Sequence, residues 1–155
     1  MPTELDNALE VILEKLTEPG QPFETTPYSK YGAEIPAFKF APPSLAHYFA
    51  HFCNQHKDVE FLVDGDLRLT FGDCWAAASH VAAGLAQEHG VKKGDRIGIA
   101  ARNSSNWIIA YMGIIMAGGC ATLLNGFWNG DELAYGIRLA ECELVLADAG
   151  RAKRL

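Results

Sequence analysis

Apolar residues recur at helical spacing near the start of the chain. Within residues 4–17 these positions are Leu5, Leu9, Ile12, Leu13 and Leu16. Spacing of this kind predicts an amphipathic helix, with Thr3 as its N-cap and Pro19-Gly20 at its end. Residues 19–43 contain six prolines and little periodicity, which predicts an extended segment. Because this segment is rich in aromatic residues, we expect residues 1–43 to form a helix and an extended stretch that wraps along a larger surface.

A helix, a hairpin and a second helix are predicted next. The first helix begins near Ser44, with Leu45, Tyr48, Phe49 and Phe52 on one face. Two β-prone runs around Asp64-Gly65-Asp66 predict a hairpin over residues 59–70. Thr70 and Asp73 have the spacing of a capping box for a long helix that stops at Gly90.

From residue 96 onward, strands and helices alternate. Strands are predicted at 96–101, 120–124 and 143–147, with helices at 106–117 and 131–140 between them. This order predicts the α/β class, a parallel sheet with helices on both faces. We assign residues 44–155 to an α/β subdomain. Its ending is unusual, because no covering helix is expected after the last strand, so the fold is predicted to be incomplete.

Composition excludes several classes of partner. The chain has 155 residues, is 49% hydrophobic and carries a net charge of −6, which opposes non-specific binding to nucleic acid. Four scattered cysteines and a start without an apolar leader predict a reduced, cytoplasmic protein. The uncharged run 107–124 is long enough for a membrane span, but glycines interrupt it, and we interpret it as a buried helix and strand.

Candidate catalytic motifs are scarce. His47 and His51 lie one helical turn apart and could ligate zinc, yet the Glu of a metalloprotease motif is missing between them, and their face is predicted to be exposed. The carboxylates Glu60, Asp64 and Asp66 crowd a hairpin turn, and turn formation accounts for them. The sequence has no Gly-x-Ser-x-Gly elbow, no Gly-x-Gly-x-x-Gly loop and no lysine-bearing phosphate loop. We therefore assign no catalytic, cofactor-binding or metal-binding residue.

Three further features need weighing, and two of them allow two interpretations. The helix start at Asn103–Asn106 could bind an anion, although ordinary capping explains it. Trp107 is most simply a packing anchor. Phe127-Trp128 is either a hydrophobic staple for the next helix or a contact surface, such as the wall of an acyl channel or a domain interface.

Five segments, in this order and spacing, resemble the adenylate-forming (AMP-binding) acyl-CoA synthetases. They are Leu69-Thr70-Phe71-Gly72-Asp73, Gly90–Ile97, Arg102–Trp107, Met116–Gly119 with Leu124-Asn125, and Asp131–Tyr135. The resemblance covers about residues 40–150. Pro22-Phe23-Glu24, the run 41–45 and Phe127-Trp128 look most like bacterial long-chain fatty-acid–CoA ligases. Leu124 replaces the family's usual proline.

This resemblance implies a two-step reaction. A carboxylate and ATP with Mg give an acyl-adenylate and pyrophosphate, and coenzyme A then displaces AMP. The family's phosphate loop, nucleotide contacts and catalytic lysine have no counterpart in residues 1–155. We therefore expect ATP, Mg and CoA to belong to a parent enzyme, this chain to bind none of them, and this chain alone to be inactive.

Two alternatives remain open. The chain could be a stand-alone binding or scaffolding module derived from the family, or an unrelated small doubly wound regulator. The partner expected from the resemblance is a fatty acid or other carboxylate that binds through the remainder of the enzyme, and a homo-oligomer is left open. Acyl chain length and the acceptor, coenzyme A or a carrier protein, are not specified by the sequence.

Overall fold

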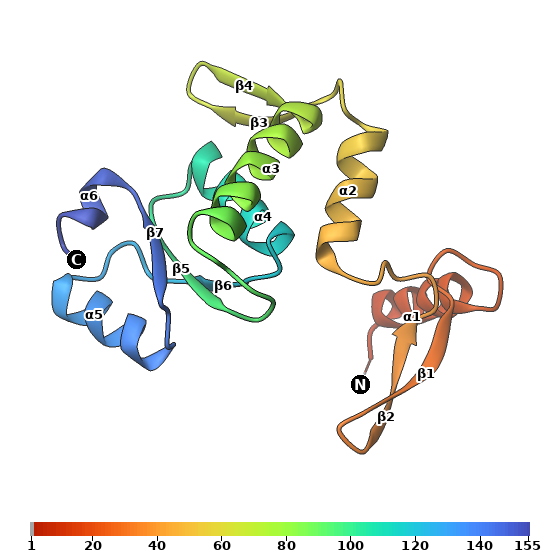
Figure 1. Ribbon diagram of the computed structural model, residues 1–155. Coiled ribbons are helices and arrows are strands. Elements are labelled where there is room, and N and C mark those ends of the chain that lie inside the picture. The colour runs from red at the N-terminus through yellow and green to blue at the C-terminus, as the bar shows by residue number, and fades with distance from the viewer. Residues whose placement is uncertain (1) are drawn as a thin grey trace. The chain divides into compact units, whose positions relative to one another are not determined.

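The chain divides into two compact units. The computed structural model describes residues 2–155 (Figure 1), and contacts between residues separate an N-terminal unit, which ends at Pro43, from a C-terminal unit, Ser44–Leu155. Each unit has its own local structure and is described separately below.

The N-terminal unit consists of a helix and a β-hairpin. Helix α1 (Glu4–Thr17) begins with a reciprocal capping box between Thr3 and Asp6, and none of its residues is buried. The capping box satisfies backbone N–H groups that the first helical turn leaves without partners. The element predicted for residues 4–17 is therefore present, with its predicted cap.

The proline-rich segment is paired, which the sequence did not lead us to expect. Strands β1 (Thr25–Lys30) and β2 (Ala33–Phe38) are antiparallel, and Pro27 lies opposite Pro36. Counting from the pair that closes the two-residue turn, this pair falls where the ladder requires no N–H donor, so both prolines fit. Tyr31 and Gly32 form the turn with positive φ angles of 53° and 79°, as a type I′ turn requires.

The C-terminal unit contains the remaining elements. In chain order they are α2 (Leu45–Gln55), β3 (Glu60–Asp64), β4 (Leu67–Thr70), α3 (Phe71–Gln87), β5 (Arg96–Ala100), α4 (Ser105–Met116), β6 (Cys120–Leu123), α5 (Gly130–Leu139), β7 (Leu144–Ala147) and α6 (Ala149–Ala152). Strands β3 and β4 form the predicted hairpin. The capping box predicted for Thr70 and Asp73 is present at the start of α3.

A three-stranded parallel sheet organises this unit. Its strand order is β6-β5-β7, so β5 lies in the centre and both neighbours run parallel to it (Figure 1). Helix α4 connects β5 to β6, and α5 connects β6 to β7 on the far side of β5. These are the βαβ crossovers expected of an α/β protein.

The two faces of the sheet are covered by different helices. Ile97 and Ile99 point to a cluster with Leu85 of α3 and Ile114 of α4. Ala100 of β5 points to the opposite face of the sheet and packs with Leu133 of α5. Because successive strand residues face opposite sides, β5 is buried on both. The α/β class with helices on both sheet faces is confirmed.

Helices α3 and α4 approach each other closely. A methyl group at Gly113 of α4 would lie 2.6 Å from Cγ1 of Val81 and 3.1 Å from the carbonyl oxygen of Ala78, both in α3. Only a residue without a side chain permits this distance. The uncharged run that contains α4 is thus a packed interior helix, and across residues 2–155 no helix has the length and apolarity needed to cross a bilayer.

The end of the chain differs from the expectation. The last strand is followed by one short helix, α6, which Asp148 caps by accepting a hydrogen bond from the backbone N–H of Arg151. Helix α6 was not predicted, since its four residues are too few to show a helical period.

Candidate functional site

The carboxyl ends of the three parallel strands meet at one edge of the sheet. Three loops start there: one runs from Ala101 to α4, one from Leu124 to α5, and one begins at Asp148. Helix α4 leads from β5 to β6 on one side, and α5 leads back past β5 to β7 on the other, so the direction in which strands are added to the sheet changes at β5. In open α/β sheets such a switch point is where ligands usually bind, so this edge is the candidate site.

Asp148 and Arg151 hold the three loops together. One carboxylate oxygen of Asp148 accepts a hydrogen bond from the backbone N–H of Arg102 at 2.9 Å, across the β5–β7 junction. The Arg151 guanidinium lies 3.3 Å from the same oxygen, and its Nε donates to the carbonyl of Gly126 at 2.8 Å. Arg151 is buried. These contacts connect the loops after β5, β6 and β7.

The same contacts favour the charged form of Asp148. The backbone N–H of Arg102, followed by that of Arg151, holds the pKa of the Asp148 carboxyl below its usual value. Hydrogen bonds to a carboxylate stabilise its ionised state. Asp148 is therefore an anion at neutral pH, held by backbone donors, and is unsuited to donate a proton.

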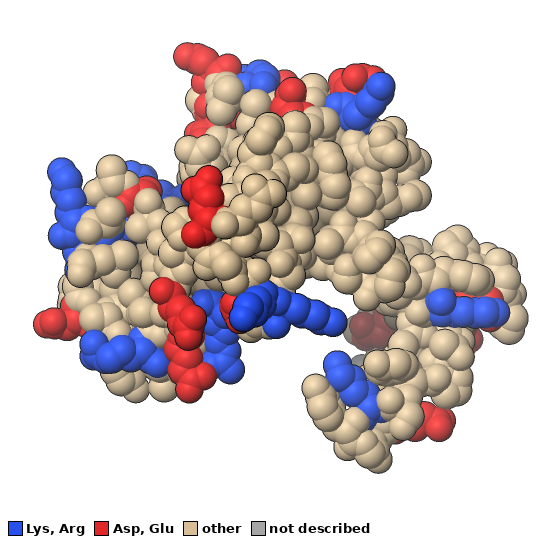
Figure 2. Space-filling view, viewed as in Figure 1, with Lys and Arg blue, Asp and Glu red and all other residues tan. Residues whose placement is uncertain are grey.

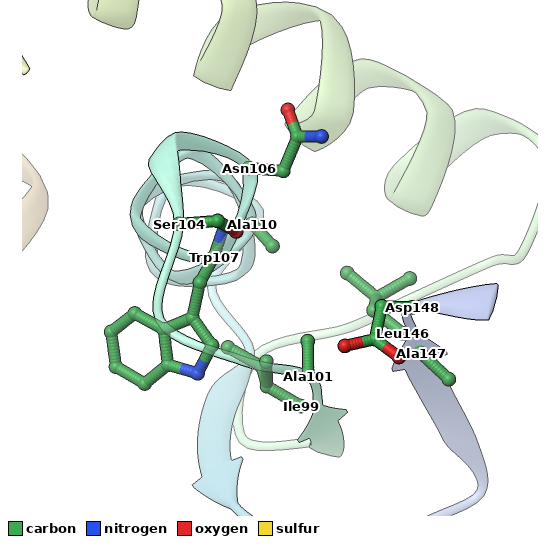
Figure 3. A pocket seen from close by; sticks show the side chains of 9 residues that line it. All are labelled: Ile99, Ala101, Ser104, Asn106, Trp107, Ala110, Leu146, Ala147 and Asp148. Atoms are coloured by element: carbon green, nitrogen blue, oxygen red, sulfur yellow. The ribbon is translucent and has the colours of Figure 1, made fainter. Parts of the chain in front are cut away.

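A small cavity opens between the ends of β5 and β7. Its volume is about 220 Å³, with Ile99 and Ala101 on one side and Leu146 on another. Figure 3 shows the Trp107 side chain and the Asp148 carboxylate on opposite sides of this space. The Trp107 ring also stacks on Tyr111, with ring centroids 5.8 Å apart and planes 4° from parallel. The cavity is mainly apolar with a polar rim, the usual composition of a small-molecule site.

A second, more polar hollow adjoins the first. Its volume is about 390 Å³, and it shares Ala101 and Trp107 with the cavity just described. Arg102, Arg151 and Phe127 are among its other lining residues. Trp107, interpreted from sequence as a packing anchor, thus packs against the core and also borders both hollows.

The start of α4 is occupied by a carboxylate of this chain. Asp64, at the end of β3, accepts hydrogen bonds from the backbone N–H of Ser105 at 2.9 Å and from its hydroxyl at 3.1 Å. Ser104 caps the same helix by accepting from the N–H of Trp107. Asp64 flanks the hairpin turn as expected, and its carboxylate also stabilises the positive end of a distant helix, which the sequence did not indicate. Two of the backbone N–H groups at this end of α4, those of Ser105 and Trp107, are thus already hydrogen-bonded to side chains of this chain.

Phe127 and Trp128 have different environments. Trp128 packs against Leu133, four residues into α5 after the N-cap Asn129, as a hydrophobic staple does. Its ring also covers Gly136, where a methyl group would lie 2.5 Å away. Phe127 is 90% exposed beside the polar hollow. The staple interpretation describes Trp128, and the contact-surface interpretation stays a prediction for Phe127.

The other candidates do not converge on the site. His47 and His51 are both exposed on α2, and the Nδ1 atom of His47 lies 2.7 Å from the Ser44 hydroxyl. Among residues 2–155 no three metal-ligating side chains form a group. Burial raises the pKa of the Cys74 thiol to about 11, so this core cysteine is not a thiolate nucleophile.

Charged side chains do not gather into one broad field on the face seen in Figure 2. Positive and negative groups lie side by side along the lower part of the C-terminal unit, and a largely uncharged band separates them from the β3–β4 hairpin. The charged side chains that line the two hollows of the candidate site are Arg102, Asp148 and Arg151.

Known proteins are similar in sequence to the C-terminal unit. Residues 49–155 match the family described as AMP-binding enzyme. The medium/long-chain-fatty-acid–CoA ligase FadD6 of Mycobacterium tuberculosis is 33% identical over 106 residues, which are 68% of this chain and 18% of that protein. The long-chain-fatty-acid–CoA ligase of Bacillus subtilis is 34% identical over 79 residues, 51% of this chain and 14% of the relative.

Solved structures share its fold. The N-terminal domain of FACL13 from M. tuberculosis has a TM-score of 0.68 at 20% identity, covering 72% of this chain and 29% of that one. The anthranilate CoA ligase AuaEII in complex with anthranoyl-AMP has a TM-score of 0.68 at 19% identity, covering 74% and 22%. At this identity the likeness concerns the fold alone.

The matches cover most of this chain but only a small part of each relative. This chain spans less than a fifth of the length of the two curated ligases. The family match includes α3, the parallel sheet and all three loops of the candidate site, and it begins after the N-terminal unit. The unrelated regulator considered above is thereby excluded, and the chain belongs to the AMP-binding enzyme family.

Proposed function

We propose that this chain is the N-terminal part of an ATP-dependent fatty-acyl-CoA ligase. The parent enzyme would join a fatty acid to AMP with release of pyrophosphate and then transfer the acyl group to coenzyme A. One observation carries the proposal: the family match across residues 49–155 coincides with 33% identity to a medium/long-chain-fatty-acid–CoA ligase. The choice of a fatty acid as substrate rests on the fatty-acid–CoA ligases among the relatives. Other relatives include a 4-coumarate–CoA ligase, which is named for a different carboxylate.

The shape of the sheet supports a role as scaffold. Strand β7 pairs with β5 on one side only, and its residues Leu144 and Leu146 are half-buried. Apolar side chains at an unpaired edge are a surface that further polypeptide can cover. In the parent enzyme, the loops joined by Asp148 and Arg151 would then support a site completed by other sequence.

We also propose that the chain alone is inactive. A triphosphate needs several converging N–H donors and a positioned cation. The start of α4 is already occupied by Asp64, and Arg151 is buried against Asp148 and Gly126. ATP, Mg and CoA would therefore bind through residues outside this chain, with these loops as support.

Two measurements test the proposal. The coding frame should be read past the Leu155 codon: a continuing frame with a Ser/Thr/Gly-rich loop ending in lysine supports it, and a stop codon there contradicts it. The 155-residue chain should then be assayed for ATP–pyrophosphate exchange beside the protein encoded by the whole frame. We expect background exchange for the former, and exchange with fatty acids above that with benzoate for the latter.

A second candidate function is a stand-alone binding or scaffolding module derived from the family. The observation that favours it is the N-terminal unit, which lies outside the family match and exposes many apolar side chains. In either case we propose a cytoplasmic protein, with residues 1–43 as a wrapping segment and residues 44–155 as the α/β subdomain. A frame that stops at Leu155, together with a well-folded soluble chain, would favour this candidate.

A further inference from the structure

One short segment of the chain borders both hollows of the candidate site. It is formed by the loop after β5 and the first residues of α4, which together are residues 101–107. Ala101 and Trp107, at the two ends of this segment, line both hollows, and each hollow has further lining residues between them. The shape of both hollows therefore depends on where this segment is held.

Two aspartates hold the segment, one near each end. Asp148 accepts a hydrogen bond from the backbone N–H of Arg102 at 2.9 Å, and it comes from the loop after β7, which is part of the site itself. Asp64 accepts from the backbone N–H of Ser105 at 2.9 Å and from its hydroxyl at 3.1 Å. Asp64 comes from the β3–β4 hairpin, and no residue of that hairpin lines either hollow.

The contact between Asp64 and Ser105 is well suited to fix a position. Both hydrogen bonds reach the same oxygen, Oδ2, so one atom restrains the backbone and the side chain of Ser105 together. Ser105 is only 6% exposed, and hydrogen bonds shielded from water are stronger than exposed ones. The positive end of α4 further favours an ionised acceptor at this place. A hairpin outside the site is thus connected to the common wall of the two hollows.

We propose that Asp64 is a positioning residue for the ligase reaction, which acts through Ser105 to hold residues 101–107 in place beside the bound substrates. This inference rests on the proposed function, since the reaction belongs to the parent enzyme. Without the Asp64 carboxylate, the segment keeps its anchor at Asp148 alone, and substrates meet a displaced wall. Loss of binding that is equal in the ground state and the transition state raises KM and leaves kcat unchanged.

Three variants of the protein encoded by the whole reading frame provide the test. Asp64→Ala removes the acceptor, Asp64→Asn keeps an acceptor oxygen without the charge, and Asp66→Ala removes an exposed carboxylate from the same turn. Thioester formation from a fatty acid, ATP and coenzyme A gives kcat and a KM for each substrate. We expect Asp64→Ala to raise at least one KM about tenfold, as loss of hydrogen bonds to a charged group does. Its kcat should stay within about twofold of the parent value.

The other two variants separate positioning from a merely structural role. Asp64→Asn should stay within about threefold of the parent KM, because its amide oxygen can accept both hydrogen bonds. Asp66→Ala should match the parent. Lower stability alone reduces the folded, active fraction and hence the apparent kcat, but it does not raise KM. Unchanged KM values for Asp64→Ala, or an equal rise for Asp66→Ala, would overturn the proposal.

Substitution of Ser105 tests the same contact from its other side. Ser105→Ala removes the hydroxyl bond and keeps the backbone bond, so we expect a smaller rise in the same KM. It also serves as the test should Asp64→Ala not fold. In the double variant the two effects should be less than multiplicative, because both substitutions act on one contact, and independent effects would overturn the proposal. A parent protein without ligase activity would overturn the proposed function together with this inference, whereas an active parent whose KM values ignore Asp64 would overturn this inference alone.

Discussion

The two units of this protein use the same kind of hydrophobic pattern with different results. In the N-terminal unit the apolar stripe of α1 is exposed along its whole length. In the C-terminal unit the apolar stripe of α3 buries Cys74, Ala78 and Leu85 against α2, α4 and the sheet. The local periodicity is helical in both, so the difference lies in what each stripe meets.

This contrast shows what a periodic pattern specifies. It determines which face of a helix is apolar, and it leaves open whether that face contacts the same unit or another molecule. The free energy of burial follows the contact, at roughly 25 cal/mol per Å² of apolar area removed from water. Substitutions at equivalent residues in the two units should therefore differ greatly in effect.

The largest difference is expected between two isoleucines. Ile99 in β5 is 1% exposed, whereas Ile12 in α1 is 52% exposed. Ile99→Ala should lower the free energy of unfolding by about 3 kcal/mol, because it leaves a cavity in a packed core. Ile12→Ala should change it by less than about 0.5 kcal/mol in dilute, non-associating protein. Urea denaturation followed by circular dichroism measures both, and equal losses would contradict the distinction between the units.

Two helical glycines form the next pair. Gly113 meets Val81 and the backbone of α3, while Gly84 has nothing within 4 Å of where a methyl group would lie. Gly113→Ala should cost about 1 to 3 kcal/mol through overpacking. Gly84→Ala should stabilise α3 by about 0.5 to 1 kcal/mol, because alanine favours the helix more than glycine does. Thermal unfolding of both variants measures these changes in stability. A stabilised Gly113→Ala variant would show that α3 and α4 are not in close contact.

The hairpin aspartates should differ by a smaller amount. Asp64 accepts two hydrogen bonds from Ser105 at the start of α4, whereas Asp66 lies exposed in the turn. Asp64→Ala should cost about 1 kcal/mol, as loss of a helix cap does, and Asp66→Ala less than about 0.5 kcal/mol. Amide hydrogen exchange at Ser105 is the most direct probe: it should quicken in the first variant alone. Unchanged exchange would mean that Asp64 does not hold α4.

The smallest effect concerns pH. The pKa of Asp148 is lowered in the folded state, chiefly by the backbone N–H of Arg102. Its stabilising contribution is therefore complete above the unfolded pKa of about 3.9 and is lost as pH falls through the folded value. Asp148→Asn should be less stable than the parent at neutral pH, and the difference should shrink at acid pH. Urea midpoints of both proteins should be measured at neutral pH and at a pH below the pKa of Asp148. A stability difference that stays constant between the two would exclude the carboxylate charge as the cause of the difference.

Most of the fold could be predicted from local signals. The caps at Thr3, Thr70 and Asn129 stand where their helices begin, because side-chain capping depends on residues three positions apart. The β1–β2 hairpin escaped prediction since prolines normally argue against strands. Pro27 and Pro36 are tolerated because their pair falls where the ladder requires no N–H donor, and that register is not visible in the sequence.

The candidate site was less predictable because it depends on contacts between distant segments. Asp64 and Ser105 are separated by 41 positions, and Arg102 and Asp148 by 46. No short motif records either pair. Once the strand order β6-β5-β7 is known, the carboxyl ends of the strands indicate where to look. The sequence contained the residues of this site, but only the sheet topology brings them together.

The central place of β5 in the sheet affects how the protein is made. Strand β5 leaves the ribosome before both of its neighbours, yet one of its edges stays open until β7 has been synthesised. During that interval a buried, apolar strand has an unpaired edge, a state prone to aggregation. Slow translation between β6 and β7 would prolong this exposure. Synonymous codons over α5 could then alter the yield of soluble protein without changing a single residue.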